Sequence, residues 1–223
     1  MAGYHQQFCP VAQALEVLGE RWTLLVVREL LCGSHRFNEL QRGVPLMSRS
    51  VLAQRLRSLR DAGVIERRDD GYYLTDAGKE LRPIVIACGK WGKRWAERKV
   101  DNADVDVGLL MWDIQRRIDL DALPRQEVVV EIEFRGAPRG KARFWLHLKH
   151  DDAELCLRRP PRGVDLTVRT SPRTMAEIWL GDTPFIAALQ AGDITVEGPR
   201  ALARAFPSWL QLSQFARVAR PRS

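Results

Sequence analysis

The chain has 223 residues and a formal net charge of +7, and 45% of its residues are hydrophobic. This composition is typical of globular proteins, and the length allows one or two domains. No apolar run reaches the roughly 18 residues that a membrane span requires, and the N-terminus lacks the pattern of a signal peptide. We therefore expect a cytoplasmic protein that does not bind a membrane.

The positive charge is concentrated in the first half of the chain. Residues 1–100 contain 17 Lys and Arg against 11 Asp and Glu, a balance of +6, whereas residues 101–223 contain 18 against 17. This asymmetry predicts an anionic partner for the first half only. The four cysteines form no C-x-x-C pair and the four histidines do not cluster with them, so we expect no metal and no cofactor.

Apolar residues at helical spacing predict three helices near the N-terminus, over 10–18, 21–32 and 36–44. Pro10 suits the first turn of the first helix, and Gly33 ends the second.

A fourth helix is predicted to follow Ser48, which is a suitable N-cap, and to end at Gly63. Its leucines recur at helical spacing and define a buried stripe, and its other faces are polar. The stripe consists of Leu52, Leu56 and Leu59. The opposite face carries Ser50, Gln54, Arg57 and Asp61, and Arg49, Arg55 and Arg60 lie on the flanks.

The segments "VIERR" (64–68) and "YYLT" (72–75) predict two strands joined by a tight "DDG" turn. Thr75 can cap a further helix, in which Pro83 is tolerated only near the start. Apolar residues in this helix follow a heptad spacing that is typical of a helix-pairing seam. They are Leu81, Ile84, Cys88, Trp91 and Trp95.

Three helices, a capped fourth with a polar outer face and a two-stranded ribbon predict a winged helix-turn-helix domain. Such a helix fits the major groove, where Gln and Arg can read base edges, while flanking arginines pair with phosphates. The predicted DNA-binding residues are Ser48, Arg49, Ser50, Gln54, Arg55, Arg57, Arg67, Arg68 and Tyr72. The alternative is an ordinary solvated surface whose arginine stems cover the leucines.

Residues 9–95 resemble the HxlR family of bacterial transcription regulators. The resemblance is carried by "CP" (9–10), "RWTLLVVREL" (21–30), "RFNEL" (36–40), "SRSVLAQRLRSLRDAGVIERR" (48–68), "YYLTDAGKEL" (72–81) and Trp91. It implies a homodimer on palindromic operator DNA, paired through the terminal helices of this domain. The interface would include Val11, Leu15, Leu81, Ile84, Cys88, Trp91 and Trp95.

Two features qualify this resemblance. The wing, "RRDDGYY", is shorter than the family's usual wing and lacks its Pro-rich segment. Cys9 stands where some family members carry a redox-sensing cysteine, and a helix N-terminus can activate a thiol. The alternative is that Cys9 is an inert packing residue.

The charged stretch 97–108 lacks a hydrophobic period. We therefore divide the chain into a first domain (1–99), a linker (100–108) and a second domain (109–223). The second domain is predicted to be α+β, with a mainly antiparallel sheet. A helix is expected over 109–123, strands over 127–136, 141–150, 153–160 and 164–171, helices over 172–181, 183–192 and 199–218, and a short extended segment over 193–198.

Residues 109–215 resemble the sterol carrier protein type 2-like fold, most specifically over 164–206. The resemblance implies helices covering a sheet around an apolar cavity that holds a hydrophobic small molecule. Candidate lining residues are Trp145, Trp179, Phe185, Phe206, Trp209 and Phe215. The alternative is that these aromatic residues simply form the core.

No nucleophile elbow, Ser–His or Cys–His pairing or phosphate-binding loop occurs, so we expect no enzyme. The leading hypothesis is a DNA-binding homodimer, expected to be a repressor, whose second domain senses an apolar effector. Alternatively, the regulator is redox-responsive or constitutive and its second domain serves dimerisation or protein interaction. A lipid carrier or enzyme with an incidental basic domain is a third hypothesis.

Overall fold

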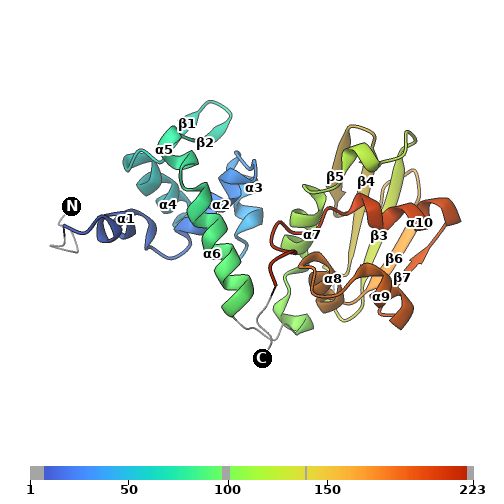
Figure 1. Ribbon diagram of the computed structural model, residues 1–223. Coiled ribbons are helices and arrows are strands. Elements are labelled where there is room, and N and C mark those ends of the chain that lie inside the picture. Colours follow the sequence, from blue (N-terminus) through green and yellow to red (C-terminus); the bar gives the residue numbers. More distant parts are fainter. Residues whose placement is uncertain (1–7, 97–100, 139, 220–223) are drawn as a thin grey trace. The chain divides into compact units, whose positions relative to one another are not determined.

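The computed structural model describes residues 8–96, 101–138 and 140–219 (Figure 1). The chain divides into two compact units, Met1–Trp91 and Gly92–Ser223. No helix in the described ranges is long and apolar enough to cross a membrane.

The first unit contains helices around a small core and a two-stranded antiparallel ribbon. Its elements are α1 (Pro10–Leu18), α2 (Thr23–Leu31), α3 (Phe37–Gly43), α4 (Arg49–Asp61), β1 (Ile65–Arg68), β2 (Gly71–Leu74), α5 (Asp76–Lys79) and most of α6 (Arg82–Trp95), whose last turn belongs to the second unit. The first four helices and the ribbon match their predicted ranges to within about two residues.

The prediction of one continuous helix after Thr75 is wrong, because α5 and α6 are separate helices. Proline has no N–H to donate, and it is tolerated only in the first turn of a helix. Pro83 is the second residue of α6, so the chain begins a new helix there instead of extending α5 through it.

The core of the first unit forms where α4 packs against α2. Leu52, Leu56 and Leu59 of α4 are at most 1% exposed, and they belong to the same buried cluster as Val26 and Val27 of α2. Truncating one buried leucine to alanine typically costs about 2–5 kcal/mol. This stripe therefore decides which side of α4 faces solvent.

A buried carboxylate lies between α2 and α3. Glu29 is fully buried, pairs with Arg28 and accepts a hydrogen bond from the Ser34 hydroxyl at 3.4 Å. Its side chain lies directly against Gly43, and a Cβ added there would overlap the Glu29 carboxylate. Arg28 also donates to the Gly43 carbonyl at 3.5 Å. Close packing of α3 on α2 therefore requires glycine at position 43.

We expect Gly43→Ala to destabilise the first unit by about 1–3 kcal/mol, because the added methyl group must displace a buried, hydrogen-bonded carboxylate. Thermal and denaturant unfolding of the full chain measures the loss. Gly92→Ala in α6 is the control, because no atom lies within 4 Å of a Cβ added there and a helix favours alanine over glycine. Equal stability of the two variants would show that α3 is not packed tightly on Glu29.

The second unit is α+β, with a five-stranded sheet. Its elements are the 3₁₀ helix η1 (Asn102–Asp104), α7 (Val107–Gln115), the 3₁₀ helix η2 (Leu120–Ala122), β3 (Val128–Phe134), β4 (Arg143–Lys149), β5 (Asp152–Cys156), β6 (Leu166–Thr170), α8 (Pro172–Trp179), α9 (Phe185–Ala191), β7 (Ile194–Glu197) and α10 (Arg200–Trp209). The strand order is β5-β4-β3-β6-β7, and only the β3–β6 pair is parallel.

Alternation along the strands gives the sheet two different faces. On β3, Val128, Val130 and Ile132 join the buried cluster formed with α7, α8, α9 and α10, and Figure 1 shows these helices on one side of the sheet. The intervening residues point to the other face, where Glu133 pairs with Arg143 and Arg169, both at 3.2 Å. One face is therefore the core, and the other, here called the charged face, carries these ion pairs beside the buried Val129 and Trp145.

Several boundaries in the second unit differ from prediction: the helix predicted over 109–123 ends at Gln115, and the strand predicted over 153–160 ends at Cys156. Residues 97–100, at the start of the charged stretch, lie outside the described residues, but 101–108 form η1 and the start of α7, where Val107 is 2% exposed. The helix predicted over 199–218 stops at Trp209. Leu210 instead forms a β-bridge with Ile118, so tertiary pairing replaces the helix there.

Candidate nucleic-acid interface

The geometry of α4 begins at its N-cap. The Ser48 hydroxyl accepts a hydrogen bond from the Val51 N–H at 3.3 Å and lies 3.0 Å from the Ser50 hydroxyl. The cap satisfies one of the free N–H groups of the first turn. Ser48 and Ser50 are both exposed, so the start of the helix presents two hydroxyl groups to solvent.

The outer face of α4 carries its longest free polar side chains. Gln54 and Arg57 are exposed and lie opposite the buried leucine stripe. Arg49, at the start of the helix, stacks over the Phe37 ring at 4.8 Å and donates to the Asn38 side-chain oxygen at 3.2 Å. Arg49 is thus held in place by α3, whereas no such contact is recorded for Gln54 and Arg57 within the described chain.

Arg55 differs from the other candidates on α4. Its side chain is only 14% exposed, and it donates to the carboxylate of Glu20 at 2.7 Å. Arg55 therefore connects α4 to the segment between α1 and α2. This arrangement makes it a weaker candidate for DNA contact than Arg49 or Arg57.

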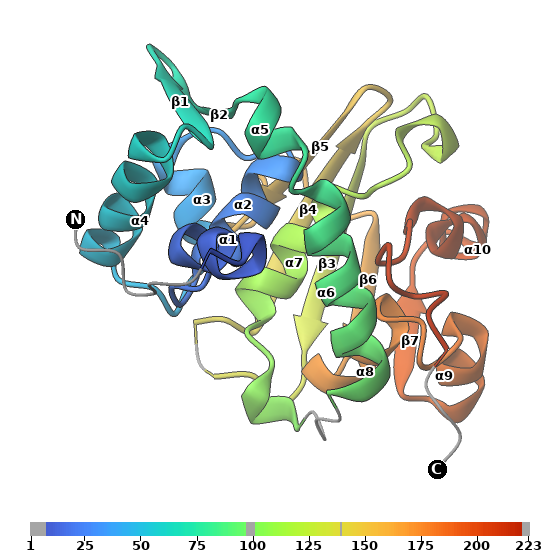
Figure 2. The same ribbon diagram turned by 60° about the vertical axis from the view of Figure 1, so that its left-hand side comes forward.

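The β1–β2 ribbon projects away from the helices, as Figure 2 shows. Arg67 lies opposite Tyr72 in the register and stacks over its ring, with 5.8 Å to the ring centroid. Arg68 stacks over Tyr73 at 4.4 Å and donates to Glu66 at 2.6 and 2.8 Å. Both arginines are exposed, and among the described residues a carboxylate pairs with Arg68 but not with Arg67.

The ribbon is fixed to the start of α3 through His35. The His35 ring stacks on Tyr73 with 4.3 Å between centroids, and the His35 carbonyl accepts a hydrogen bond from the Tyr72 N–H at 2.9 Å. Glu39 in turn accepts the N–H groups of His35 and Arg36, both at 3.0 Å. Partial burial raises the pKa of Glu39, but these two hydrogen bonds together with the nearby charge of Arg36 lower it overall. The wing and α3 therefore form one connected unit.

Sequence reasoning missed Asn38 and Tyr73. Asn38 positions Arg49, and Tyr73 joins His35, Arg68 and Asp70. Asn38 follows Phe37 in an exposed turn of α3, and no pattern in the sequence links it to α4. In the sequence, Tyr73 is one of two adjacent tyrosines in a predicted strand, and nothing there indicates its contacts with His35, Arg68 and Asp70.

The residues predicted to pair two chains lie on α1 and α6, except Leu81, which lies in the turn between α5 and α6. Val11, Leu15, Ile84, Trp91 and Trp95 are among the exposed large hydrophobic residues, and Trp91 is 64% exposed. Cys88 is exposed as well, whereas Leu81 is half-buried against the first unit's core. Cys9 is exposed at the N-cap of α1.

The predicted ligand-lining aromatic residues are dispersed. Trp179, Phe206 and Trp209 are packed in the core of the second unit, with Phe206 edge-on to both Phe185 and Trp209. Trp145 alternates with core residues of β4 and belongs to the other face of the sheet, and Phe215 is half-buried beyond α10. Of these six residues, Phe185 is the one that lines the apolar pocket of about 400 Å³ described next.

That pocket lies beside α8, α9 and the segment after α10. It is lined by Ile178, Gly181, Thr183, Pro184, Phe185, Pro207, Leu210, Leu212, Ala216 and Arg217. Most of the lining is apolar, and Thr183 and Arg217 supply its side-chain polar groups.

Residues 17–100 match the family described as HxlR-like helix-turn-helix. The chain is 38% identical over 100 residues to the HTH-type transcriptional regulator YvaP of Bacillus subtilis, a match covering 92% of that protein and 41% of this chain. It is also 38% identical over 97 residues to the HTH-type regulator Mb3122 of Mycobacterium bovis, covering 60% of that protein and 40% of this chain. The crystal structure of quinone-bound YodB from B. subtilis, 33% identical, covers 38% of this chain and 97% of that chain with a TM-score of 0.36.

The first unit is therefore a helix-turn-helix unit of the transcription-regulator class. The chain belongs to the HTH-type transcriptional regulators with an HxlR-like helix-turn-helix.

A wing residue offers a direct test of the ribbon geometry. Tyr73 donates to Asp70 at 2.7 Å, and this hydrogen bond lowers the pKa of Asp70 and raises that of Tyr73. Because the folded-state pKa of Asp70 is lowered, its contribution to wing stability is present above the unfolded carboxyl pKa. That contribution is lost as the pH falls through the folded pKa.

We expect Tyr73→Phe to raise the pKa of Asp70 towards the ordinary value for aspartate, as measured by NMR titration of its side-chain carboxyl group. Tyr72→Phe is the control, because Tyr72 makes no recorded hydrogen bond to Asp70 within the described chain. An Asp70 pKa that is the same in both variants and the native chain would contradict this geometry of the turn.

Proposed function

We propose that this protein is a homodimeric repressor that binds palindromic operator DNA through α4 and the β1–β2 wing, and that its second unit senses a hydrophobic small molecule. The observation that carries the DNA-binding part is the outer face of α4. It presents Ser50, Gln54 and Arg57 on the side opposite its buried leucines, and the N-cap Ser48 and the flanking Arg49 are exposed at its start.

Each of these side chains suits a particular part of a DNA duplex. A helix enters the major groove with its N-terminal residues near the base edges, where Gln suits adenine and Arg suits guanine. Gln54 and Arg57 are therefore proposed as base-reading residues. The residues proposed to contact the DNA backbone are Ser48, Arg49, Ser50, Arg67, Arg68 and Tyr72. Arg55 would join them only on breaking its ion pair with Glu20.

Arg57→Ala is expected to weaken binding to a duplex selected from a random library by about 1–3 kcal/mol and to relax base preference at one position of each half-site. Fluorescence anisotropy with singly substituted duplexes measures both effects. Arg60→Ala is the control, because Arg60 pairs with Asp61 at the far end of the helix. It should leave base preference unchanged, and an unchanged profile for Arg57→Ala would remove Arg57 from the base-reading set.

The homodimer is supported by the apolar side chains that α1 and α6 expose. Tryptophan and other large apolar residues in contiguous exposed positions mark interaction surfaces more often than scattered single ones do. Ile84, Trp91 and Trp95 recur at heptad spacing on α6, and Cys88 completes the seam. A two-fold axis would also explain how two α4 helices reach two half-sites.

We expect Trp91→Asp to convert the protein from a dimer to a monomer in sedimentation-velocity experiments, because a carboxylate would be buried in the apolar seam. Ile186→Asp on α9 is the matched control, an exposed apolar residue of the second unit that lies outside the seam. A Trp91→Asp variant that sediments as the native protein does would refute the α6 pairing.

Effector binding is supported by the pocket beside α8 and α9. Its size, about 400 Å³, is within the range of small-molecule sites, and its apolar lining with few polar groups suits a hydrophobic ligand. The ligand would regulate DNA binding only if it prefers one arrangement of the dimer over another.

We expect native mass spectrometry of the purified chain to show a bound apolar molecule that is released on organic extraction. Leu212→Lys should abolish this binding, because it places a charge in the lining. Leu120→Lys, at an exposed leucine outside the pocket, should retain the molecule. Failure of the native chain to bind any of a panel of apolar compounds would contradict the effector proposal.

A second candidate is favoured by the exposure of Cys9 at the N-cap of α1. In this alternative the regulator responds to thiol oxidation, and the second unit serves only dimerisation or protein interaction. The Cys9→Ser variant distinguishes the two: loss of oxidant-sensitive DNA binding supports a thiol sensor, and its retention excludes Cys9 from that role.

A further inference from the structure

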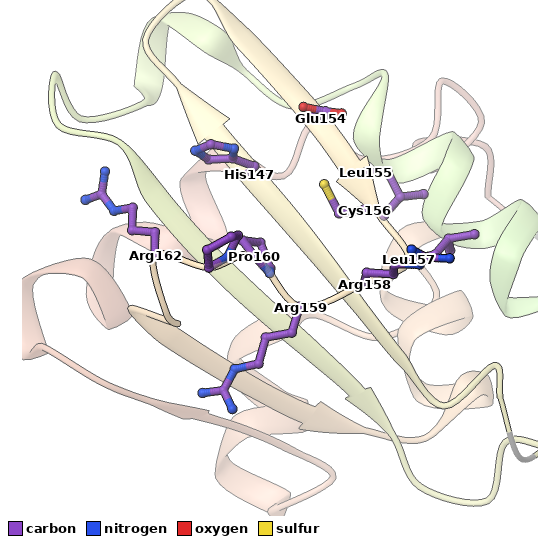
Figure 3. A pocket seen from close by; sticks show the side chains of 10 residues that line it. His147, Glu154, Leu155, Cys156, Leu157, Arg158, Arg159, Pro160 and Arg162 are labelled. Atoms are coloured by element: carbon purple, nitrogen blue, oxygen red, sulfur yellow. The ribbon is translucent and has the colours of Figure 1, made fainter.

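The connection between β5 and β6 crosses the charged face of the second unit's sheet. Because β5 and β6 lie on opposite sides of the β4–β3 pair, the chain between them must pass over both strands. Figure 3 shows residues 157–163, here called the strap, passing over the sheet on the side that carries His147. The strap and the strands border a shallow, open pocket of about 570 Å³.

The strap contains three arginines within five residues, in the sequence Arg158-Arg159-Pro160-Pro161-Arg162. Arg162 anchors it, donating to the Glu127 carboxylate at 3.0 Å and to the Glu127 carbonyl at 2.8 Å. Arg158 and Arg159 are exposed, and no hydrogen bond or ion pair is recorded for either within the described chain. Pro160 and Pro161 fix their φ angles, which reduces the conformational freedom of the segment that carries the arginines.

The directions of the three arginine side chains indicate whether their partner is a small anion or an extended polyanion. Figure 3 shows the guanidinium groups of Arg158, Arg159 and Arg162 pointing away from one another. A single small anion needs cationic groups that converge, and Glu154, which also lines the pocket, would repel it. An extended polyanion instead offers many phosphates to cations that diverge, since duplex DNA carries one negative charge per about 1.7 Å of axis.

The concentration of charge in the strap is also local. Residues 101–223 have a balance of only +1, so three arginines in five residues are not part of a generally basic surface. Arginine pairs well with phosphate, and contacts of this kind add affinity without reading sequence.

We propose that the strap is a second, sequence-independent contact surface for the DNA phosphate backbone, carried by Arg158 and Arg159. This inference rests on the proposed DNA-binding function of the first unit and extends it to the second. It predicts that the full-length protein neutralises more phosphates than the helix-turn-helix and wing supply.

The test compares two double variants of the full chain that remove the same charge from the same unit. Arg158→Gln/Arg159→Gln alters the strap, and Arg200→Gln/Arg204→Gln alters exposed residues of α10. Binding of a duplex of about four helical turns is measured by anisotropy over a range of salt concentrations. The strap variant should lower the slope of log K against log salt by about two and weaken binding at least about tenfold near physiological salt. The α10 variant should keep the native slope.

Equal slopes for the two variants would overturn the strap proposal, since the effect would then be one of net charge. So would a strap variant that binds DNA normally but loses binding to inorganic phosphate or to vesicles of about one-third phosphatidylserine. Absence of salt-dependent DNA binding by the native chain would instead refute the proposed function itself. The two failures are therefore distinguishable.

Discussion

The burial of three leucines on one side of α4 is the constraint on which the rest of the proposed interface depends. Leu52, Leu56 and Leu59 leave water by packing into the core that α2 and its neighbours form, and this packing fixes the rotation of α4 about its own axis. With that rotation set, Gln54 and Arg57 face solvent. The buried Glu29 and the absence of a side chain at Gly43 then bring α3 close to α2, where Asn38 can hold Arg49.

A comparable constraint organises the second unit. Alternation along β3 directs Val128, Val130 and Ile132 into the helix-covered core and turns Glu133 to the other face, where it joins a network of ion pairs with Arg143 and Arg169. Such exposed pairs contribute little stability individually, typically about 0–1 kcal/mol. The fold therefore depends little on the side chains of the charged face, which is the face that the strap crosses. Three of the six aromatic residues proposed as ligand contacts, Trp179, Phe206 and Trp209, are buried in the core, and Phe185 is the one that lines the apolar pocket.

Much of the first unit could be predicted because its signals are local. Ser48 as a cap, the leucine spacing and the Asp-Asp-Gly turn are set by neighbours in the chain, and the structure places each within about two residues of expectation. The ion pair of Arg55 with Glu20 could not be predicted, since it joins residues 35 positions apart. The end of α10 at Trp209 likewise depends on a β-bridge between Leu210 and Ile118, which is far away in sequence.

The most direct test of the account asks whether α4 occupies the major groove. Guanine N7 lies in that groove, so methylation interference on a duplex selected by the full-length protein reports contacts there. We predict that N7 methylation blocks binding at guanines in two symmetric half-sites about one helical turn, or a multiple of it, apart. Binding that is unaffected by N7 methylation at every guanine of the selected site would contradict the placement of α4 in the major groove.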